Sequence, residues 1–328
     1  MILLLISASA SVIKGGQNRQ QWRSKQQLGQ KQDRQDRLED HDELIMTHND
    51  GIHDGGQALN VVWRNDPPGT KAPNYQDFWF NDNTVIVRQS EQLSFEKPFI
   101  YMLFGEDKIL LQDTGAANSE DPTFRQKIEQ LIDEHCRRTG KPNSNLGLLV
   151  THSHAHGDHT FNDPEFIGAP NTRIAGLSPN EVADFFGMAS FEGEPTTFDL
   201  GNRPLLIFGI PGHEESSIAI YDPQTKWLLT GDSLYPGRLF VSDFVQYKQS
   251  IKRLANAVRQ RNLQVDLIMG THIEIDRNGN EFEEGAIFQP NEHPLELHLK
   301  NLFELEQALD SMKELQREVH KEFIIQPV

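Results

Sequence analysis

The chain has a single cysteine, Cys136, and no apolar run approaching the roughly 20 residues that a membrane-spanning helix needs. One cysteine excludes an intramolecular disulfide and a cysteine-rich zinc module. Positive charge is also scarce, because 31 Lys and Arg stand against 48 Asp and Glu, a formal net charge of −17. This excess argues against nucleic acid or an anionic membrane surface as a partner. We therefore expect no nucleic-acid partner and no integral membrane segment.

Hydrophobic residues make up only 37% of the 328 residues, so part of the chain is expected to lie outside a packed core. Residues 1–13 are a short apolar stretch that ends in small residues, as in a secretory signal, but they lack the basic start. Residues 17–35 contain eight glutamines and few apolar anchors, which is typical of a disordered linker. Export to the periplasm or the exterior is favoured over a cytoplasmic location, with an accidental apolar N-terminus as the alternative.

These features predict an N-terminal region, residues 1–43, that comprises the candidate signal and the linker, and a folded domain over residues 44–328. The N-terminal region holds seven basic and six acidic residues. The predicted domain therefore carries a charge of −18, so the acidity belongs to the folded part.

Short runs of Val, Ile, Leu and Phe alternate with segments of helical spacing along this domain. The class is therefore α/β or layered α+β. The expected strands are Thr84–Gln89, Pro98–Phe104, Lys108–Gln112, Leu148–Thr151, Pro204–Ile210, Ser217–Tyr221, Trp227–Thr230 and Asp266–Met269, and the expected helices are Asp121–Arg138, Phe244–Arg261 and Pro294–Glu314. The last helix is amphipathic, and its apolar face either covers the core or forms a homodimer contact.

Thr151–His159 reads THSHAHGDH, which places four histidines and an aspartate directly after an expected buried strand. Burying so many polar rings together is costly unless something satisfies them. A divalent metal does so, because neutral imidazole and carboxylate are good ligands of zinc and similar ions. The segment therefore predicts a metal site.

The spacing His154-x-His156-x-Asp158-His159 resembles the metal motif of the metallo-β-lactamase superfamily. Three further motifs of that family follow in order, each at the end of an expected strand, and an Asp-x-Gly motif precedes them. They contain His213, Asp232, His272 and, upstream, Asp113.

The resemblance implies a four-layer αββα sandwich of the α+β class that binds two divalent metal ions, with zinc expected and iron or manganese as alternatives. It assigns His154, His156 and His213 to one metal. It assigns the other metal to Asp158, His159 and His272, with Asp232 bridging the two. Asp113 is expected to orient a ligand rather than to bind metal.

The resemblance also implies a metal-dependent hydrolase in which a metal-bound hydroxide attacks a small ester, lactone, thioester or amide. Asp158 is expected to orient the water and accept its proton. The alternative is a mononuclear iron thiol dioxygenase of the persulfide type on the same fold, because the first motif is shared. The acidic domain favours a small neutral substrate over a polyanion.

Several further residues have two readings each. Tyr235 either polarises the substrate carbonyl, as a tyrosine at this spacing does in N-acyl homoserine lactonases, or packs on its loop. Arg238 either binds a substrate carboxylate or pairs with a nearby acid, and His293 either contacts substrate or belongs to a helix-entry loop. His152 and Glu274 are expected to support the site or to be structural, and Cys136 is expected to be structural.

Overall fold

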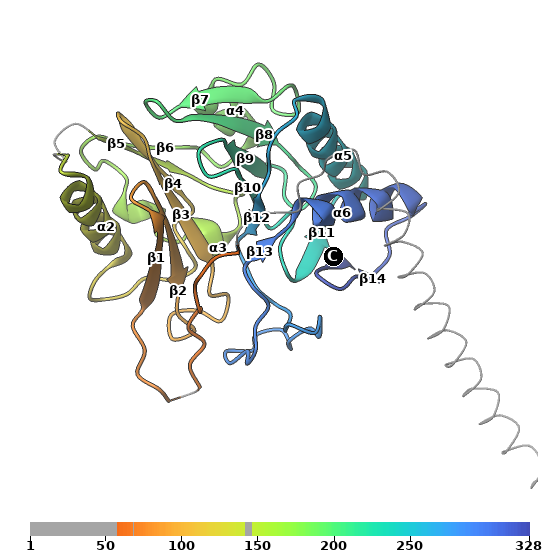
Figure 1. The fold of residues 1–328 in the computed structure, drawn as a ribbon, viewed down its shortest axis with the longest axis horizontal. Coiled ribbons are helices and arrows are strands. Elements are labelled where there is room, and N and C mark those ends of the chain that lie inside the picture. Colours follow the sequence, from red (N-terminus) through yellow and green to blue (C-terminus); the bar gives the residue numbers. More distant parts are fainter. Residues whose placement is uncertain (1–57, 68, 142–145) are drawn as a thin grey trace, which may run out of the picture. The chain divides into compact units, whose positions relative to one another are not determined.

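The computed structural model describes residues 58–67, 69–141 and 146–328 (Figure 1). The predicted N-terminal region, residues 1–43, lies outside the described residues, as does the start of the predicted domain. No helix within the described ranges is long and apolar enough to cross a membrane.

The first sheet has six strands in the order of the sequence. Neighbouring strands are antiparallel up to β4, and β4, β5 and β6 run parallel to one another. Its strands are β1 (Tyr75–Asn81), β2 (Thr84–Gln89), β3 (Phe99–Phe104), β4 (Lys108–Gln112), β5 (Gly147–Thr151) and β6 (Thr172–Ile174).

The second sheet also has six strands, in the order β13-β12-β10-β9-β8-β7, and only its β10–β12 pair is parallel. A three-stranded sheet, β11-β15-β14, completes the described strands. The bounds are β7 (Thr196–Asp199), β8 (Pro204–Gly209), β9 (Ile218–Asp222), β10 (Trp227–Gly231), β11 (Arg238–Val241), β12 (Leu267–Gly270), β13 (Glu296–Leu297), β14 (Glu318–Val319) and β15 (Ile324–Pro327).

The helices begin where the sequence supplies caps. Thr123 forms a capping box at the start of α2, and Ser178 forms one at the start of α4. Gly140 and Gly187 end these two helices in the left-handed conformation. The bounds are α2 (Phe124–Thr139), α3 (Gly157–Thr160), α4 (Pro179–Phe186), α5 (Phe244–Gln260) and α6 (Leu299–Ser311), with a short 3-10 turn, η2, at Asp163–Glu165.

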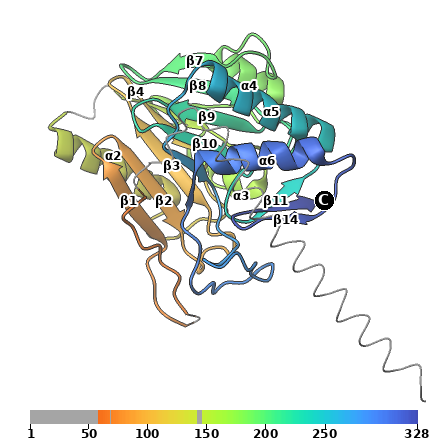
Figure 2. The same cartoon turned by 45° about the vertical axis from the view of Figure 1, so that its right-hand side comes forward.

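The strand pleat divides the core into three apolar layers. In β4, Leu110 packs between the two sheets, whereas Ile109 and Leu111 face α2. In β8, Ile207 packs between the sheets and Phe208 faces the layer that holds α5 and α6. Figures 1 and 2 show α2 outside the first sheet and α5 and α6 outside the second. The predicted α+β class and the αββα sandwich are therefore confirmed.

The expected elements agree with the observed ones except at particular boundaries. The helix predicted from Asp121 begins at Phe124, after its Thr123 cap. The helix predicted from Pro294 begins at Leu299, because Glu296 and Leu297 pair with β12 instead. The prediction missed several elements, most of them short, namely β1, β6, β7, β11, β13, β14, β15, α3, η2 and α4.

Two backbone hydrogen bonds join the two sheets at the end of the sandwich where β4, β5, β10 and β12 terminate. The Ile218 N–H donates to the Ser153 carbonyl at 2.8 Å, and the Phe99 N–H donates to the Thr271 carbonyl at 2.9 Å. The loops that follow β5 and β12 are therefore held against the opposite sheet.

A buried ion pair joins the two sheets at the opposite end of the sandwich. Arg203 is 1% exposed, and its Nη2 lies 2.6 Å from Asp222 Oδ2 and 2.8 Å from Thr84 Oγ1. Its Nη1 donates to the Phe104 carbonyl at 3.1 Å. The guanidinium thus satisfies groups from both sheets.

Replacing Arg203 by Leu is expected to lower the free energy of unfolding by about 3–5 kcal/mol, because Asp222 is left buried without its cation. Urea denaturation measures this. The matched control is Arg261→Leu, because Arg261 forms a surface ion pair with Glu194 and is 41% exposed. That change should cost about 0–1 kcal/mol. Equal losses in the two variants would contradict the role of the buried pair.

Candidate metal centre

The segment after β5 brings four of the predicted ligands to the end of the first sheet. His154 follows β5 and is buried, and His156 is the exposed N-cap of α3. Asp158 and His159 lie in the single turn of α3, with Asp158 partly exposed and His159 fully buried. His154 and His156 thus precede α3 and belong to one donor group, whereas Asp158 and His159 lie within α3 and belong to the other.

Two glycines allow the other loops to reach the same place. Gly212, before His213, has φ +134°, and a Cβ there would lie 2.3 Å from the Tyr247 backbone. Gly231, before Asp232, has φ +53°, and a Cβ there would lie 2.7 Å from the Ser153 side chain. Any larger residue at either position would push the loop, and hence the ligand, out of place.

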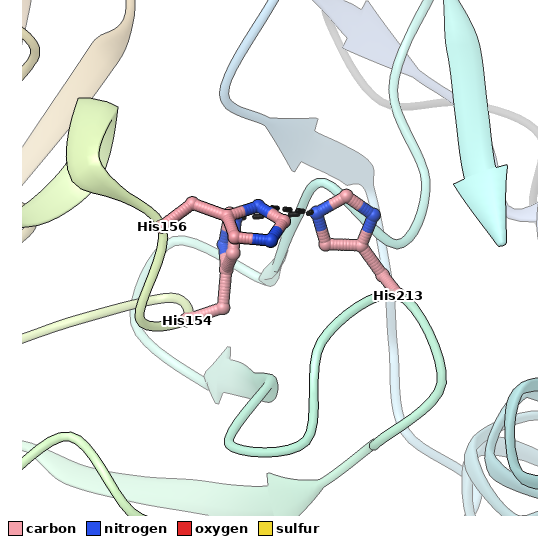
Figure 3. Close-up of side chains that lie close together, drawn as sticks. All are labelled: His154, His156 and His213. Atoms are coloured by element: carbon pink, nitrogen blue, oxygen red, sulfur yellow. Dashed lines mark hydrogen bonds between the residues drawn. The ribbon is translucent and has the colours of Figure 1, made fainter. Parts of the chain in front are cut away.

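His154, His156 and His213 form the first donor group (Figure 3). His154 Nε2 lies 2.9 Å from His156 Nδ1, and His213 Nε2 lies 3.2 Å from each of these atoms. Three ring nitrogens therefore converge on one point from two different loops.

Asp158, His159, Asp232 and His272 form the second donor group. Asp158 Oδ2 lies 3.1 Å from His159 Nε2 and 3.3 Å from His272 Nε2. The two ring nitrogens are 3.4 Å apart. This group joins loops of both sheets.

The Asp232 carboxylate faces both groups with different oxygens. Its Oδ2 lies 3.8 Å from His154 Nε2 and 3.7 Å from His213 Nε2. Its Oδ1 lies 3.7 Å from His159 Nε2 and 3.5 Å from His272 Nε2. The carboxylate therefore stands between the two groups.

The donors suit divalent metal ions in type and spacing. A tetrahedral zinc ion with ligands at about 2.0–2.1 Å places those ligands about 3.4 Å apart, close to the separations within each group. Imidazole nitrogens and carboxylate oxygens are ligands of zinc, iron and manganese. The geometry is thus compatible with one ion in each group and a shared Asp232.

Carbonyl and carboxylate oxygens orient most of these rings. His159 Nδ1 lies 2.9 Å from Asp113 Oδ2, His213 Nδ1 lies 2.7 Å from the Phe240 carbonyl, and His272 Nδ1 lies 3.0 Å from the Glu96 carbonyl. Because these oxygens only accept hydrogen bonds, each Nδ1 donates a proton to its partner, and Nε2 is the ring atom that faces the site.

Asp113 occupies the place expected of a residue that orients a ligand. It is fully buried, and besides His159 it accepts a hydrogen bond from the Ser153 N–H at 2.6 Å. Its φ of +74° is unusual for a residue with a Cβ, and such strain persists where the surroundings hold the residue firmly. Asp113 thus ties β4 to the loop that carries the histidines.

The two groups differ in their electrostatics. Burial lowers the pKa of His154 well below its usual range and also lowers the pKa of His213. Burial alone would also lower the pKa of His272, but the Asp232 and Asp158 carboxylates outweigh it and raise that pKa to about 10. In the absence of metal at pH 7, His154 and His213 are therefore neutral, whereas His272 holds a proton.

Tyr235 and Arg238 both contact Glu274. The Tyr235 hydroxyl is 2.9 Å from Glu274 Oε2, and its buried ring packs edge-on against His272. Arg238 Nη2 pairs with Glu274 Oε1 at 2.9 Å. These contacts fit the interpretation in which Tyr235 packs on its loop and Arg238 pairs with a nearby acid. Glu274 supports this loop.

The remaining predicted residues lie outside both donor groups. His152 Nε2 lies 2.9 Å from Asp163 Oδ1, which fits a supporting role. His293 contacts Glu322 and the Pro294 carbonyl, as a residue of the loop before α6. Cys136 is half-buried in α2 against the apolar layer outside the first sheet.

The sequence interpretation missed three groups that touch the ligands. The Thr271 hydroxyl donates to Asp232 Oδ1, and the Ser153 hydroxyl donates to Asp113 Oδ2 at 2.9 Å. Ser153 and Thr271 each lie next to a predicted histidine in the sequence, so the motifs themselves could have identified them as supporting residues. The Glu96 carbonyl had no such signal, because every residue has a carbonyl.

A family model described as the metallo-beta-lactamase superfamily matches residues 95–272 of this chain. A hydroxyacylglutathione hydrolase from Chromohalobacter salexigens is 29% identical over 168 residues, which cover 49% of this chain and 58% of the relative. The acyl-coenzyme A thioesterase MBLAC2 of Bos taurus is 22% identical over 205 residues, which cover 51% of this chain and 68% of the relative.

The alignment to the hydroxyacylglutathione hydrolases spans about half of their length, 58% in one and 46% in another from Acaryochloris marina. Among solved structures, a metallo-beta-lactamase from Pontibacter korlensis is 17% identical with a TM-score of 0.46, and the match covers 73% of this chain and all of that chain.

The Asp232→Ala variant is expected to bind metal at least about 100-fold more weakly at both donor groups, because one carboxylate faces both. Metal titration against a chelator measures the two affinities separately. His213→Ala should weaken only the first group, and His272→Ala only the second. Retention of two tightly bound ions by Asp232→Ala would contradict the shared position of this carboxylate.

Metal binding to the second donor group is expected to release protons at pH 7, because His272 must lose its proton to bind. Its affinity should therefore rise with pH up to about 10. The affinity of the first group should change less between pH 7 and 9. Calorimetry in buffers of different ionisation enthalpy counts the released protons, and equal release in both binding steps would contradict this assignment.

Proposed function

This chain belongs to the metallo-beta-lactamase superfamily, and from that premise we propose that it is a hydrolase of small acyl compounds that works with two divalent metal ions. The observation that carries the proposal is the Asp232 carboxylate, which faces His154 and His213 of the first donor group with one oxygen and the second donor group with the other. Zinc is the ion proposed for both positions, because nitrogen and carboxylate ligands at these spacings suit it.

Two ions bound in these groups would lower the pKa of a shared water to about 7 and polarise the substrate carbonyl. No serine or cysteine nucleophile is then required. The first ion is proposed to bind His154, His156 and His213, and the second Asp158, His159 and His272, with Asp232 shared between them.

Asp158 is the proposed catalytic carboxylate. Its side chain is 22% exposed, more than that of the other acids in the two groups, so it can reach both solvent and the site. The neighbouring His159 and His272, which outweigh the effect of burial, hold the pKa of Asp158 below its usual range. An ionised carboxylate at this position can orient a water molecule and accept its proton.

Tyr235 is not included in this mechanism. Its hydroxyl is engaged by Glu274, so polarising a substrate carbonyl would first require that contact to break. We propose instead that Tyr235 keeps His272 in place by packing against its ring. A lactonase activity therefore gains no support from this residue.

Thioesters are the proposed first choice among ester, lactone, thioester and amide substrates. One relative is named an acyl-coenzyme A thioesterase and another a hydroxyacylglutathione hydrolase, and both names describe removal of an acyl group. The charge of −18 outside residues 1–43 favours small substrates of low negative charge. Export and a homodimer remain predictions, although the apolar face of α6 is buried in the core and is not a free dimer surface.

The mononuclear iron dioxygenase is the competing function, and metal content separates the two. The proposed hydrolase binds two zinc ions per chain and consumes no oxygen. The competitor binds one iron and consumes oxygen with a thiol substrate. The second donor group, with four side chains within reach of one ion, favours the hydrolase.

We expect the protein reconstituted with zinc to hydrolyse at least one member of a panel of thioesters, lactones, β-lactams and phosphodiesters, with the highest kcat/KM on a thioester. Chelation should abolish the activity and zinc should restore it. Asp158→Asn should lower kcat by about 100-fold or more even with zinc in excess, which is needed because Asp158 is also a proposed ligand of the second ion. The control is Asp184→Asn, a change in α4, remote from both donor groups. Oxygen consumption with bound iron and no hydrolysis would overturn the proposal.

A further inference from the structure

Three buried charged side chains form a network beside His272. Arg88 donates to both oxygens of Glu292, at 2.7 and 2.6 Å, and Lys97 Nζ lies 3.1 Å from Glu292 Oε1. Lys97 Nζ also donates to Gln289 Oε1 at 2.6 Å. The charged side chains are only 3%, 2% and 7% exposed for Arg88, Lys97 and Glu292. We call Arg88, Lys97 and Glu292 the buried charge network.

The network joins segments that are far apart in the sequence. Arg88 lies in β2, Lys97 lies just before β3, and Glu292 lies some 200 residues later in the loop before β13. Burying two cations and one anion is costly unless the charges are paired. Glu292 pairs with both cations, although the buried Arg88 Nε has no hydrogen-bond partner, so the network holds these segments in one arrangement.

The backbone on both sides of Lys97 contacts the segment that carries His272. The Glu96 carbonyl accepts from His272 Nδ1 at 3.0 Å, and the Phe99 N–H donates to the Thr271 carbonyl at 2.9 Å. Lys97 itself has φ +46°, a conformation that a residue with a Cβ adopts only when its surroundings impose it. The buried side chain of Lys97 supplies that constraint.

We propose that the buried charge network positions His272, by holding the Glu96 carbonyl where it accepts the Nδ1 proton and turns Nε2 toward the second donor group. Lys97 and its partners are thus positioning residues for the second metal ion only. This inference rests on the proposed function insofar as that function requires a metal ion in the second group.

Removing Lys97 should affect metal binding in opposite directions depending on whether Lys97 acts through its charge or by positioning the Glu96 carbonyl. A single substitution can therefore distinguish these two roles. The network has a net charge of +1, and removing a cation near a divalent ion should tighten metal binding if charge alone matters. If Lys97 acts by placing the Glu96 carbonyl, its removal weakens the second site instead. Lys97→Met preserves the length of the stem and leaves Arg88 paired with Glu292.

Lys97→Met is expected to bind the second ion about 10–100-fold more weakly, with the affinity of the first ion unchanged. The matched control is Lys226→Met. Lys226 also has a left-handed backbone, at φ +57°, but its side chain is 48% exposed and its ion pair with Asp266 is at 3.7 Å. The control should keep both affinities.

A second readout needs no metal. In the metal-free protein labelled with ¹⁵N-histidine, the Nδ1 proton of His272 should be protected from exchange by its bond to Glu96, and Lys97→Met should remove that protection. The corresponding proton of His213, which donates to the Phe240 carbonyl, is the internal reference. It should be unaffected.

Unchanged or tighter binding of the second ion in Lys97→Met would overturn the inference, as would equal weakening at both ions. If Lys97→Met does not fold, Gln289→Met removes only one acceptor of Lys97 and should give the same selective loss to a smaller degree. The proposed function fails separately, when the unaltered chain binds no second ion or hydrolyses nothing.

Discussion

The structure depends on one buried anion, the Asp232 carboxylate, among imidazole rings that reach it from three loops. A carboxylate that is 8% exposed is costly to bury unless positive charge or hydrogen bonds compensate for it. His154 and His213 face one oxygen, and His159 and His272 face the other. The loops after β5, β8 and β12 must therefore all converge at this edge of the sandwich.

The two sheets bring these loops together because contacts join the sheets at both ends of the sandwich. Arg203 and Asp222 join them at one end, and the Ile218–Ser153 and Phe99–Thr271 backbone bonds join them at the other. If the two sheets were not joined at one of these ends, the loops that carry the two donor groups could move apart. The stability of the fold and the geometry of the metal centre therefore depend on the same contacts.

Much of the fold follows from local patterns. Buried strands such as β4 and β9 are apolar runs that the sequence marks clearly. The observed bounds of β4 are the expected ones, and those of β9 are shifted by one residue. Most of the elements that escaped prediction are short, and strands such as β6 are partly exposed and carry no clear alternation. For α6, pairing of Glu296 and Leu297 with β12 overrides a helical pattern.

The sequence by itself indicated which side chains could hold metal, because the candidates after β5 lie within six residues and each remaining one follows a recognisable strand. The family resemblance also implied their division into two groups, but only the tertiary structure shows that each Asp232 oxygen faces a different group. It also decided the orientation of His272, through the Glu96 carbonyl and the Lys97–Glu292 contact. A backbone carbonyl is present at every residue, and an ion pair across 195 positions has no local pattern, so neither is visible before the chain folds.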